Sequence, residues 1–401
     1  PRGDNDDPKH AAVVQDIKAG LEQDGLSDLV QESRVADEGG EGGSNGPRSV
    51  QRRPALAATE IYLPQVLYVA DGAVRPLDYE QDVLFALDSG GLDHAPRIAG
   101  IPDNLHAAER QMQRIRLAEP ATSGGERFVA ELSAATGEAA AFDPAYAVRM
   151  ITDIVPNPWV GRELVGALLD GLRGRGFDDA KLGEHAGYLV QELRKWLDAE
   201  RDRMAEAHFR AEVAAERIQF RLRTDRCNWA MPPTSLTYAP EGAEQLVGRD
   251  GGPLQRSLFA PIYRSELNDL ERQVAVYLDA EKSLAWWHRN VARNQYAVQG
   301  WRRERIYPDF LFAVLPPAQQ HTGNRVVVLE LKGEHLSGNP DTEYKQAVLA
   351  LMTESFRTQQ LDRVGELELV GGDGTRVECD LVLATEWQAR LAEKLEPSHP
   401  A

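Results

Sequence analysis

Two carboxylates and a lysine near the end of the chain have the residue types and spacing that metal-assisted hydrolysis requires. Asp309 follows Pro308 in a β-prone segment, and Glu330 and Lys332 end the apolar run that begins at Val326. Residues two apart on a strand face the same side, so Glu330 and Lys332 are predicted to project into one site. A buried charge needs a compensating partner. We therefore expect Asp309 and Glu330 to share a hard divalent cation, Mg²⁺ or alternatively Mn²⁺.

These three side chains could divide the work of phosphodiester hydrolysis. That reaction needs an activated water, a neutralised phosphate and a stabilised leaving oxygen. Asp309 and Glu330 are assigned to the metal, and Lys332 to orienting the water or stabilising the charge of the transition state. Other triplets of an acid, any residue and a lysine begin at Asp7, Asp16, Asp179 and Glu343. Only the triplet at Glu330 ends an apolar strand behind a Pro-Asp pair, and this context carries the prediction.

The charge of the chain is strongly acidic but unevenly spread. The formal net charge is -18 over 401 residues, which disfavours a generally basic nucleic-acid-binding surface. Acids crowd the first 45 positions, whereas arginines gather between Arg289 and Arg305. We expect one local basic groove.

Cys227 and Cys379 lie far apart, without a zinc-site pattern. No long apolar run or secretion signal is present, so we predict no membrane association and a cytoplasmic location.

Composition and periodicity divide the chain into four predicted segments. Residues 1–50 form an acidic, Gly-rich linker. Residues 51–145 form a small β-containing subdomain with a hairpin turn at Asp71-Gly72. Residues 146–250 form a helical connector subdomain. Residues 251–401 hold the chemistry-bearing residues. The predicted class is α/β (α+β): a mixed sheet flanked by helices, preceded by a small β region and a helical subdomain.

Finer elements are predicted within this frame. The charged stretch Asp198–Arg217 is expected to be a solvated helix face. In the last segment the predicted order is a helix Glu266–Leu284, strands Tyr296–Val298, Arg305–Val314 and Arg325–Leu331, a helix Thr342–Glu354, and a hairpin of Glu366–Val370 with Val377–Leu383.

Six segments of the sequence together carry a family resemblance. They are Ile154-Val155-Pro156-Asn157-Pro158-Trp159, Ile218-Gln219-Phe220-Arg221-Leu222, Trp286-Trp287-His288-Arg289-Asn290, Gln299-Gly300-Trp301, Tyr307-Pro308-Asp309-Phe310 and Glu330-Leu331-Lys332-Gly333. The chain resembles the PD-(D/E)xK nucleases and, more closely, the nuclease end of helicase-linked restriction subunits of the type III kind. The resemblance implies catalytic roles for Asp309, Glu330 and Lys332, and it implies that Glu271 is an additional acid near the metal.

The resemblance also implies a biological setting. It implies a restriction-endonuclease-like fold and Mg²⁺-dependent endonuclease activity on double-stranded DNA, in restriction or antiviral defence. It further implies a helicase motor preceding residue 1 and a methyltransferase or specificity subunit as partner. The chain opens on Pro1 rather than Met, and we expect a C-terminal fragment. The sequence contains no GxxxxGK[ST] phosphate loop, so ATP would act only through that motor.

Further residues are candidates for contacting DNA. Basic side chains beside aromatic residues suit a nucleic-acid strand, and a helix N-terminus favours phosphate. The candidates are Arg289, Asn290, Arg302, Arg303, Lys345 and Gln346. Plainer interpretations stand beside these: a polar edge on a tryptophan pair for Arg289, surface positions for Lys345 and Gln346, and a solvated acid for Glu271.

Two alternatives to a restriction nuclease remain open at this point. The first is a catalytically silent DNA-binding or scaffolding module of a helicase complex, which the intact set of Asp309, Glu330 and Lys332 disfavours. The second is a DNA-repair helicase-nuclease, which shares the chemistry and differs only in its setting.

Overall fold

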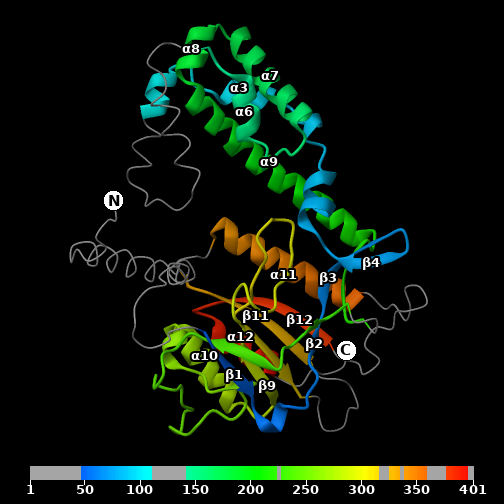
Figure 1. The fold of residues 1–401 in the computed structure, drawn as a ribbon, viewed down its shortest axis with the longest axis vertical. Helices are drawn as coiled ribbons and strands as arrows, with labels where there is room; N and C mark the ends of the chain where they lie inside the picture. Colours follow the sequence, from blue (N-terminus) through cyan, green and yellow to red (C-terminus); the bar gives the residue numbers. More distant parts are fainter. Residues whose placement is uncertain are drawn as a thin grey trace, which may run out of the picture.

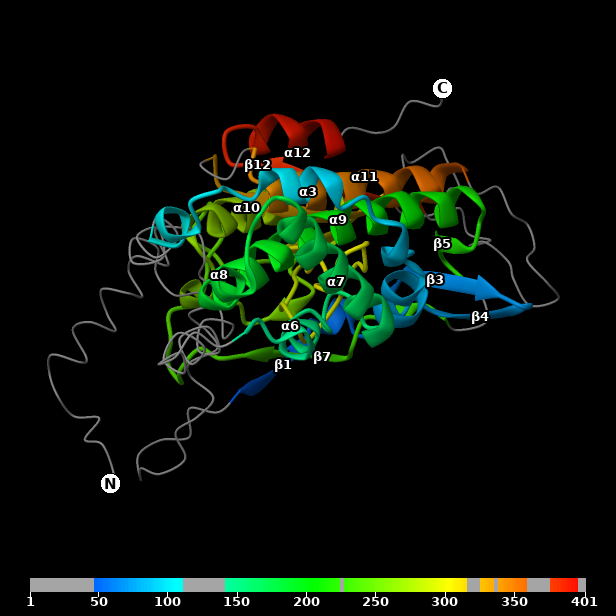
Figure 2. The ribbon, with the colours of Figure 1, turned by 90° about the horizontal axis from the view of Figure 1, so that it is seen from above.

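The protein combines a helical unit with a body built around β-sheets, which confirms the predicted mixed class (Figure 1). The computed structural model describes residues 47–110, 141–223, 227–315, 325–334, 338–358 and 376–395. The helical unit is joined to the body through the long helix α9 (Ala186–Ala214). Seen from above, α11 and α12 run along one side of the molecule, with β1 and β7 on the opposite side (Figure 2).

A four-stranded mixed sheet forms the centre of the body, in the order β12-β11-β10-β9. Its strands are β9 (Leu284–Arg289), β10 (Phe310–Val314), β11 (Arg325–Lys332) and β12 (Arg376–Leu383). Strands β9, β10 and β11 are antiparallel neighbours, whereas β11 and β12 are parallel. A parallel pair needs a crossover, and α11 (Pro340–Thr358) lies between these two strands in the chain.

Both faces of the central sheet are covered, because successive residues of a strand point to opposite sides. Val326 and Val328 of β11 pack into the cluster that includes α11. Val327, Leu329 and Leu331 pack into a second cluster, with α10 (Asp269–Ala280) and α12 (Trp387–Leu395). Burial on both faces explains why β11 is a nearly continuous apolar run in the sequence.

Three small sheets are built from strands that lie far apart in the chain. Their pairings are β7-β1-β8, β2-β6 and β4-β3-β5. The strands are β1 (Arg48–Arg52), β2 (Tyr62–Leu63), β3 (Gln65–Ala70), β4 (Ala73–Pro76), β5 (Ile218–Arg221), β6 (Trp229–Ala230), β7 (Thr234–Thr237) and β8 (Phe259–Ala260). These pairings join residues on both sides of the predicted boundaries at 145/146 and 250/251.

The hairpin predicted at Asp71-Gly72 is present between β3 and β4. Asp71 has φ 51° and Gly72 has φ 76°. A two-residue hairpin loop favours positive φ at both positions, and glycine and aspartate tolerate this conformation. The sequence signal therefore identified this turn for the correct physical reason.

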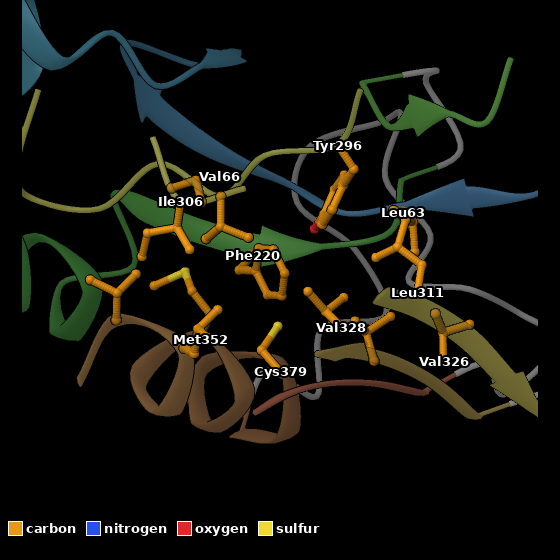
Figure 3. Packing of buried hydrophobic residues seen from close by; sticks show 14 of the residues in the cluster. Leu63, Val66, Phe220, Tyr296, Ile306, Leu311, Val326, Val328, Met352 and Cys379 are labelled. Carbon is orange, nitrogen blue, oxygen red and sulfur yellow. The ribbon is translucent and has the colours of Figure 1, made fainter. Parts of the chain in front are cut away.

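One hydrophobic core joins the small sheets to the central sheet. Phe220 of β5 is fully buried, and its ring lies among Val66, Ile306, Met352 and Cys379 (Figure 3). These side chains come from β3, a loop, α11 and β12. Because one cluster includes residues from the first and last strands of the described chain, the body is a single packing unit.

The helical unit surrounds a third apolar cluster. Its helices are α3 (Ala95–Gly100), α6 (Pro144–Met150), α7 (Pro158–Gly174) and α8 (Asp179–Glu184), together with the first half of α9. Helix α7 begins where the side chain of Asn157 accepts a hydrogen bond from the N–H of Trp159 at 3.0 Å, with Pro158 at the first helical position. The helical period predicted within residues 146–250 is present in α7, α8 and α9, whereas α3 precedes that range and β5, β6 and β7 lie inside it. Short helical turns also occur at η2 (Pro54–Leu56), η3 (Tyr79–Val83), η4 (Leu84–Ala86), η5 (Ser89–Gly91) and η6 (Arg264–Glu266).

The second half of α9 corrects the prediction of a fully solvated helix face. Ala205 and Phe209 are fully buried, and Glu212 is 5% exposed. The ring of Phe209 packs edge-on against Trp301 of the body at a centroid distance of 5.8 Å. Helix α9 also ends at Ala214, before the predicted limit. One face of the helix is therefore core and includes the buried Glu212, and the other charges occupy the remaining faces.

Several predicted elements of the last segment differ from the structure. The helix expected to reach Leu284 ends at Ala280, and β9 follows it. The strand expected at Tyr296–Val298 is only an isolated bridge between Val298 and Ile306. Strand β12 is present, but its described partner is β11 rather than the first strand of a hairpin. That first strand, residues 366–370, lies outside the described residues, as do residues 1–46 of the predicted linker.

Candidate active site

The two predicted carboxylates, Asp309 and Glu330, lie together where the inner strands β10 and β11 of the central sheet begin and end. Strand β10 begins at Phe310, which pairs with Leu329 of β11, so continuing the register places Asp309 opposite Glu330. Asp309 had been predicted inside a strand, but it lies one residue before β10. Its Oδ2 accepts a hydrogen bond from the N–H of Leu331 at 2.6 Å. This bond fixes the Asp309 carboxylate against the end of β11.

Glu330 lies on the same face of β11 as Val328, toward α11, and it is 3% exposed. Its Oε1 is 3.2 Å from Nζ of Lys332 and accepts a hydrogen bond from Nζ of Lys345 at 3.0 Å. Its Oε2 is buried and has no hydrogen-bond partner among the described residues. Two ammonium groups therefore offset the charge at one oxygen of Glu330, while the other oxygen stays available to a ligand.

The carboxyl of Asp309 has a strongly perturbed pKa. Burial raises it well above its usual value, and the charges of Glu330 and Glu271 raise it further. The N–H of Leu331 and the charge of Lys332 work in the opposite direction. A carboxyl whose pKa is raised by burial and by neighbouring carboxylates lies in an electrostatic environment that a divalent cation relieves.

Glu271 is buried in the first turn of α10, at 6% exposure, so its interpretation as a solvated acid is wrong. It forms a reciprocal capping box with Asn268: the N–H of Asn268 donates to Oε2 at 2.8 Å, and the N–H of Glu271 donates to Oδ1 of Asn268 at 2.9 Å. Oε1 is 3.6 Å from Nη2 of Arg289. Glu271 thus lies close enough to act on Asp309 through its charge, while one of its oxygens caps the helix.

Asn290 was predicted as a DNA contact, but it is a buried positioning residue instead. It is 3% exposed, and its side-chain N–H groups donate to the carbonyls of Tyr296 at 2.8 Å and Pro308 at 2.9 Å. Its Oδ1 accepts from the N–H of Tyr296 at 3.1 Å. Its own backbone N–H donates to the carbonyl of Asp309 at 2.8 Å. Asn290 therefore holds both residues of the Pro-Asp pair, a role that single-sequence patterns do not reveal.

The neighbouring His288 is also buried, at 2% exposure. Its Nε2 lies 2.7 Å from Oε1 of Gln295, and its ring packs edge-on against Phe259. Burial lowers the pKa of His288 to about 4, although the contact with Gln295 works in the opposite direction. The imidazole is thus neutral at physiological pH and belongs to the core.

The other DNA-contact candidates divide between the site and its surroundings. Lys345 joins the site through Glu330, and Arg289 approaches it through Glu271. Gln346 is exposed on the next position of α11. A role for Arg289, Lys345 or Gln346 in DNA binding stays a prediction.

Arg302 and Arg303 engage acidic residues that lie about one hundred residues or more earlier in the chain. Nε of Arg302 is 2.9 Å from Oδ2 of Asp202, and its guanidinium lies 4.5 Å from the centroid of the Tyr344 ring. Nη2 of Arg303 is 2.8 Å from Oε1 of Glu80. Both arginines therefore tie the body to α9 and its neighbours, and DNA contacts by them stay a prediction.

The donor set suits a magnesium ion that keeps much of its water. Among the described residues, no group of three or more histidines, cysteines and acids has the arrangement of a metal site. Mg²⁺ usually binds through only one or two carboxylates, with water filling the remaining positions. Asp309 and Glu330, with the unpartnered Oε2 of Glu330, match that requirement.

No protein-family model matches this chain, and neither a curated protein nor a solved structure matches it. Among the helices of the described residues, none has the length and apolar character needed to cross a lipid bilayer. Assignment of a function therefore rests on the geometry around Asp309, Glu330 and Lys332.

Proposed function

We propose that the chain carries a Mg²⁺-dependent nuclease site that hydrolyses phosphodiester bonds of double-stranded DNA. The observation that carries this proposal is the pairing of Asp309 and Glu330 where β10 begins and β11 ends, with Lys332 beside them. The unpartnered Oε2 of Glu330 supplies a ready ligand atom. Asp309 and Glu330 would hold the ion, which supplies charge neutralisation of the phosphate and a more acidic water when bound.

The residues of the chain have separate tasks in this scheme. Asp309 is held in place by the N–H of Leu331, and its neighbour Pro308 by Asn290. Lys332 and Lys345 both share Oε1 of Glu330. Lys332, whose Nζ lies 3.2 Å from Oε1 of Glu330, would donate to the attacking water or to a phosphate oxygen. Glu271 adds negative charge near Asp309 and thereby favours cation binding.

The proposed setting is a helicase-nuclease that acts in restriction or antiviral defence. The motifs from Ile154 to Gly333 support that setting through their family resemblance. A motor preceding residue 1, a methyltransferase or specificity subunit, and a cytoplasmic location belong to the same proposal. A repair helicase-nuclease would use the same site and the same chemistry.

The test is nicking of supercoiled plasmid by the purified chain. We expect nicking in Mg²⁺, none in EDTA, and a loss of at least about 100-fold in Lys332→Ala, because removing one group that stabilises transition-state charge has effects of that size. Glu343→Ala is the matched control, since this exposed residue lies on α11 near Lys345. Equal behaviour in Mg²⁺, in EDTA and in Lys332→Ala would contradict the proposal and favour a catalytically silent DNA-binding module.

A further inference from the structure

The loop of residues 299–303 lies directly against the first turns of α11, the helix that carries Lys345. A Cβ added at Gly300 would lie 2.5 Å from Oη of Tyr344 and 2.6 Å from Cγ2 of Val348. Non-bonded carbon atoms prefer separations of about 3.5–4.0 Å, so only glycine permits this approach. The φ of Gly300 lies outside the left-handed region, so glycine is needed here for space alone.

Tyr344 is held by further contacts from the 299–303 loop. The N–H of Arg302 donates to Oη of Tyr344 at 3.3 Å, and the guanidinium of Arg302 lies 4.5 Å from the centroid of the Tyr344 ring. Trp301 packs edge-on against the same ring at a centroid distance of 5.2 Å. Because Tyr344 is only 6% exposed, its ring has little room to move away from these neighbours.

The 299–303 loop is itself fixed on its other side. The side-chain amide of Gln299 donates to the carbonyls of Gly300 at 3.1 Å and Arg302 at 2.7 Å. Trp301 also packs against Phe209 of α9, at a centroid distance of 5.8 Å. A loop that is held by its own hydrogen bonds and backed by a packed helix cannot withdraw from α11. A side chain at Gly300 would therefore displace α11 rather than the loop.

A displacement of α11 would reach the candidate active site through Lys345. Tyr344 directly precedes Lys345, and Val348 follows it by three residues, so the two side chains that contact Gly300 flank this lysine on the helix. Nζ of Lys345 donates to Oε1 of Glu330 at 3.0 Å. A separation of about 3.6 Å is no longer a hydrogen bond, so a small shift of the helix is enough to break this contact.

We propose that Gly300 and Arg302 are positioning residues of the nuclease site, which hold α11 where Lys345 reaches Glu330. Both residues act through Tyr344. This inference rests on the proposed function for the reaction that the contact supports, whereas the contact between Lys345 and Glu330 can be measured without DNA. The Gln299-Gly300-Trp301 motif of the sequence thereby has a role in the site.

The experiment is a double-mutant cycle of Gly300→Ala with Lys345→Met in the full chain. Urea unfolding in EDTA without DNA measures the coupling of the two changes in the fold, and plasmid nicking in Mg²⁺ measures it in the reaction. Lys345→Met should lower the urea midpoint of wild type, because Glu330 loses a partner, but should hardly change that of Gly300→Ala. A residue that acts only on general stability would give additive shifts instead.

The reaction should show the same coupling. We expect Gly300→Ala to slow nicking by about tenfold or more, because a small misplacement of a site residue has effects of this size. Lys345→Met should then slow Gly300→Ala by less than about twofold further, since the contact is already lost.

Gly166→Ala is the matched control, because a Cβ added at Gly166 of α7 would meet none of the described atoms within 4 Å. It should nick like the wild type, and Lys345→Met should keep its full effect in that background. Arg302→Ala is the second test variant if Gly300→Ala fails to fold, since Asp202 keeps its contact with Arg201 at 2.9 Å. Its cycle with Lys345→Met is followed by unfolding alone, where contacts with DNA play no part.

The outcomes separate the positioning role from the chemistry. Additive effects of Gly300→Ala and Lys345→Met on the urea midpoint would overturn the proposal, and additive effects of Arg302→Ala would do so in its place. Full nicking by Gly300→Ala would overturn it as well. Coupled unfolding without nicking by the wild type in Mg²⁺ would support the positioning of Lys345 and contradict the proposed nuclease function alone.

Discussion

Lys345 donates a hydrogen bond from Nζ to Oε1 of Glu330 at 3.0 Å, so a second lysine shares the carboxylate that Lys332 contacts. Burial works to lower the pKa of Lys345, but the charges of Glu330 and Asp341 outweigh it and the pKa is raised. Lys345 is therefore an ammonium at neutral pH. Without a divalent ion, the two lysines hold the buried charge of Glu330 in the fold.

Replacing Lys345 should separate ion binding from catalysis. In Lys345→Met a cation next to Glu330 is lost, so repulsion of Mg²⁺ falls and the ion should bind about threefold more tightly or better. Plasmid nicking should nevertheless slow, because Glu330 is less firmly positioned. Thermal unfolding titrated with Mg²⁺ gives the affinity, and nicking gives the rate.

Gln346→Ala is the control for this prediction, because Gln346 is exposed on the same turn of α11. It should leave both quantities unchanged. Weaker Mg²⁺ binding in Lys345→Met would show that Lys345 supports the ion rather than competing with it.

Asn290 should matter for stability and for the position of Asp309. Asn290→Ala removes three side-chain hydrogen bonds and leaves the buried carbonyls of Tyr296 and Pro308 without these donors. We expect a loss of about 3 kcal/mol in the free energy of unfolding. Urea unfolding followed by tryptophan fluorescence measures it.

The matched control for Asn290→Ala is Asn294→Ala, an exposed asparagine of the same loop whose contact to Tyr238 is 3.5 Å long. Asn294→Ala should lower the free energy of unfolding only slightly. Nicking by Asn290→Ala at a temperature where the variant is folded should still be slower than wild type, because the Pro-Asp pair is less fixed. Full activity there would limit Asn290 to a role in stability.

The sequence predicts most reliably what depends on local periodicity and on strand context. The two-residue repeat of strand geometry placed Glu330 and Lys332 on one face of β11, and the helical period identified α7 and α9. Strand β9 was missed because its apolar positions continue the pattern of the preceding helix. The cause is physical: both faces of β9 are covered, so it lacks the alternation that marks a half-buried strand.

Long-range pairing explains the other differences. Arg302 looked like part of a basic groove in its local sequence, but it meets Asp202, and Arg303 meets Glu80. Strand β1 pairs with β7 and β8, and both of these strands lie roughly two hundred residues later in the chain. Neither the partners of a surface arginine nor the neighbours of a short strand such as β1 are encoded by spacing within one segment. Both depend on the packing of the whole body.

Removing the charge of Asp309 should stabilise the metal-free fold. The folded pKa of Asp309 lies above its usual value of 3.8, first through burial and then through Glu330 and Glu271. The folded state therefore holds a proton that the unfolded state has released, and stability is lost as pH rises from about 3.8 through the folded pKa. Asp309→Asn avoids this loss and should therefore be more stable than wild type at pH 8 in EDTA.

Mg²⁺ should reverse the order of stability, so that wild type becomes more stable than Asp309→Asn. An ion that binds only the folded wild type raises its melting temperature, whereas Asp309→Asn lacks a carboxylate and should respond weakly. Differential scanning fluorimetry with and without Mg²⁺ measures both effects. Glu343→Gln, an exposed acid on α11, should follow the wild type. An equal response to Mg²⁺ in Asp309→Asn and wild type would remove Asp309 from the ion site.

His288 should make the protein sensitive to mild acid. Burial lowers its folded pKa from 6.5 to about 4, so between these values the unfolded state binds a proton that the folded state does not. The contribution to stability is complete above pH 6.5 and is lost as pH falls toward 4, by up to about 3 kcal/mol. His288→Gln cannot titrate in this range, and its free energy of unfolding should fall less between pH 7 and pH 4.5.

Urea unfolding at matched pH values gives the difference between His288→Gln and wild type, with the exposed His106→Gln as control. If wild type and His288→Gln lose stability in parallel, the acid sensitivity has its origin elsewhere in the fold.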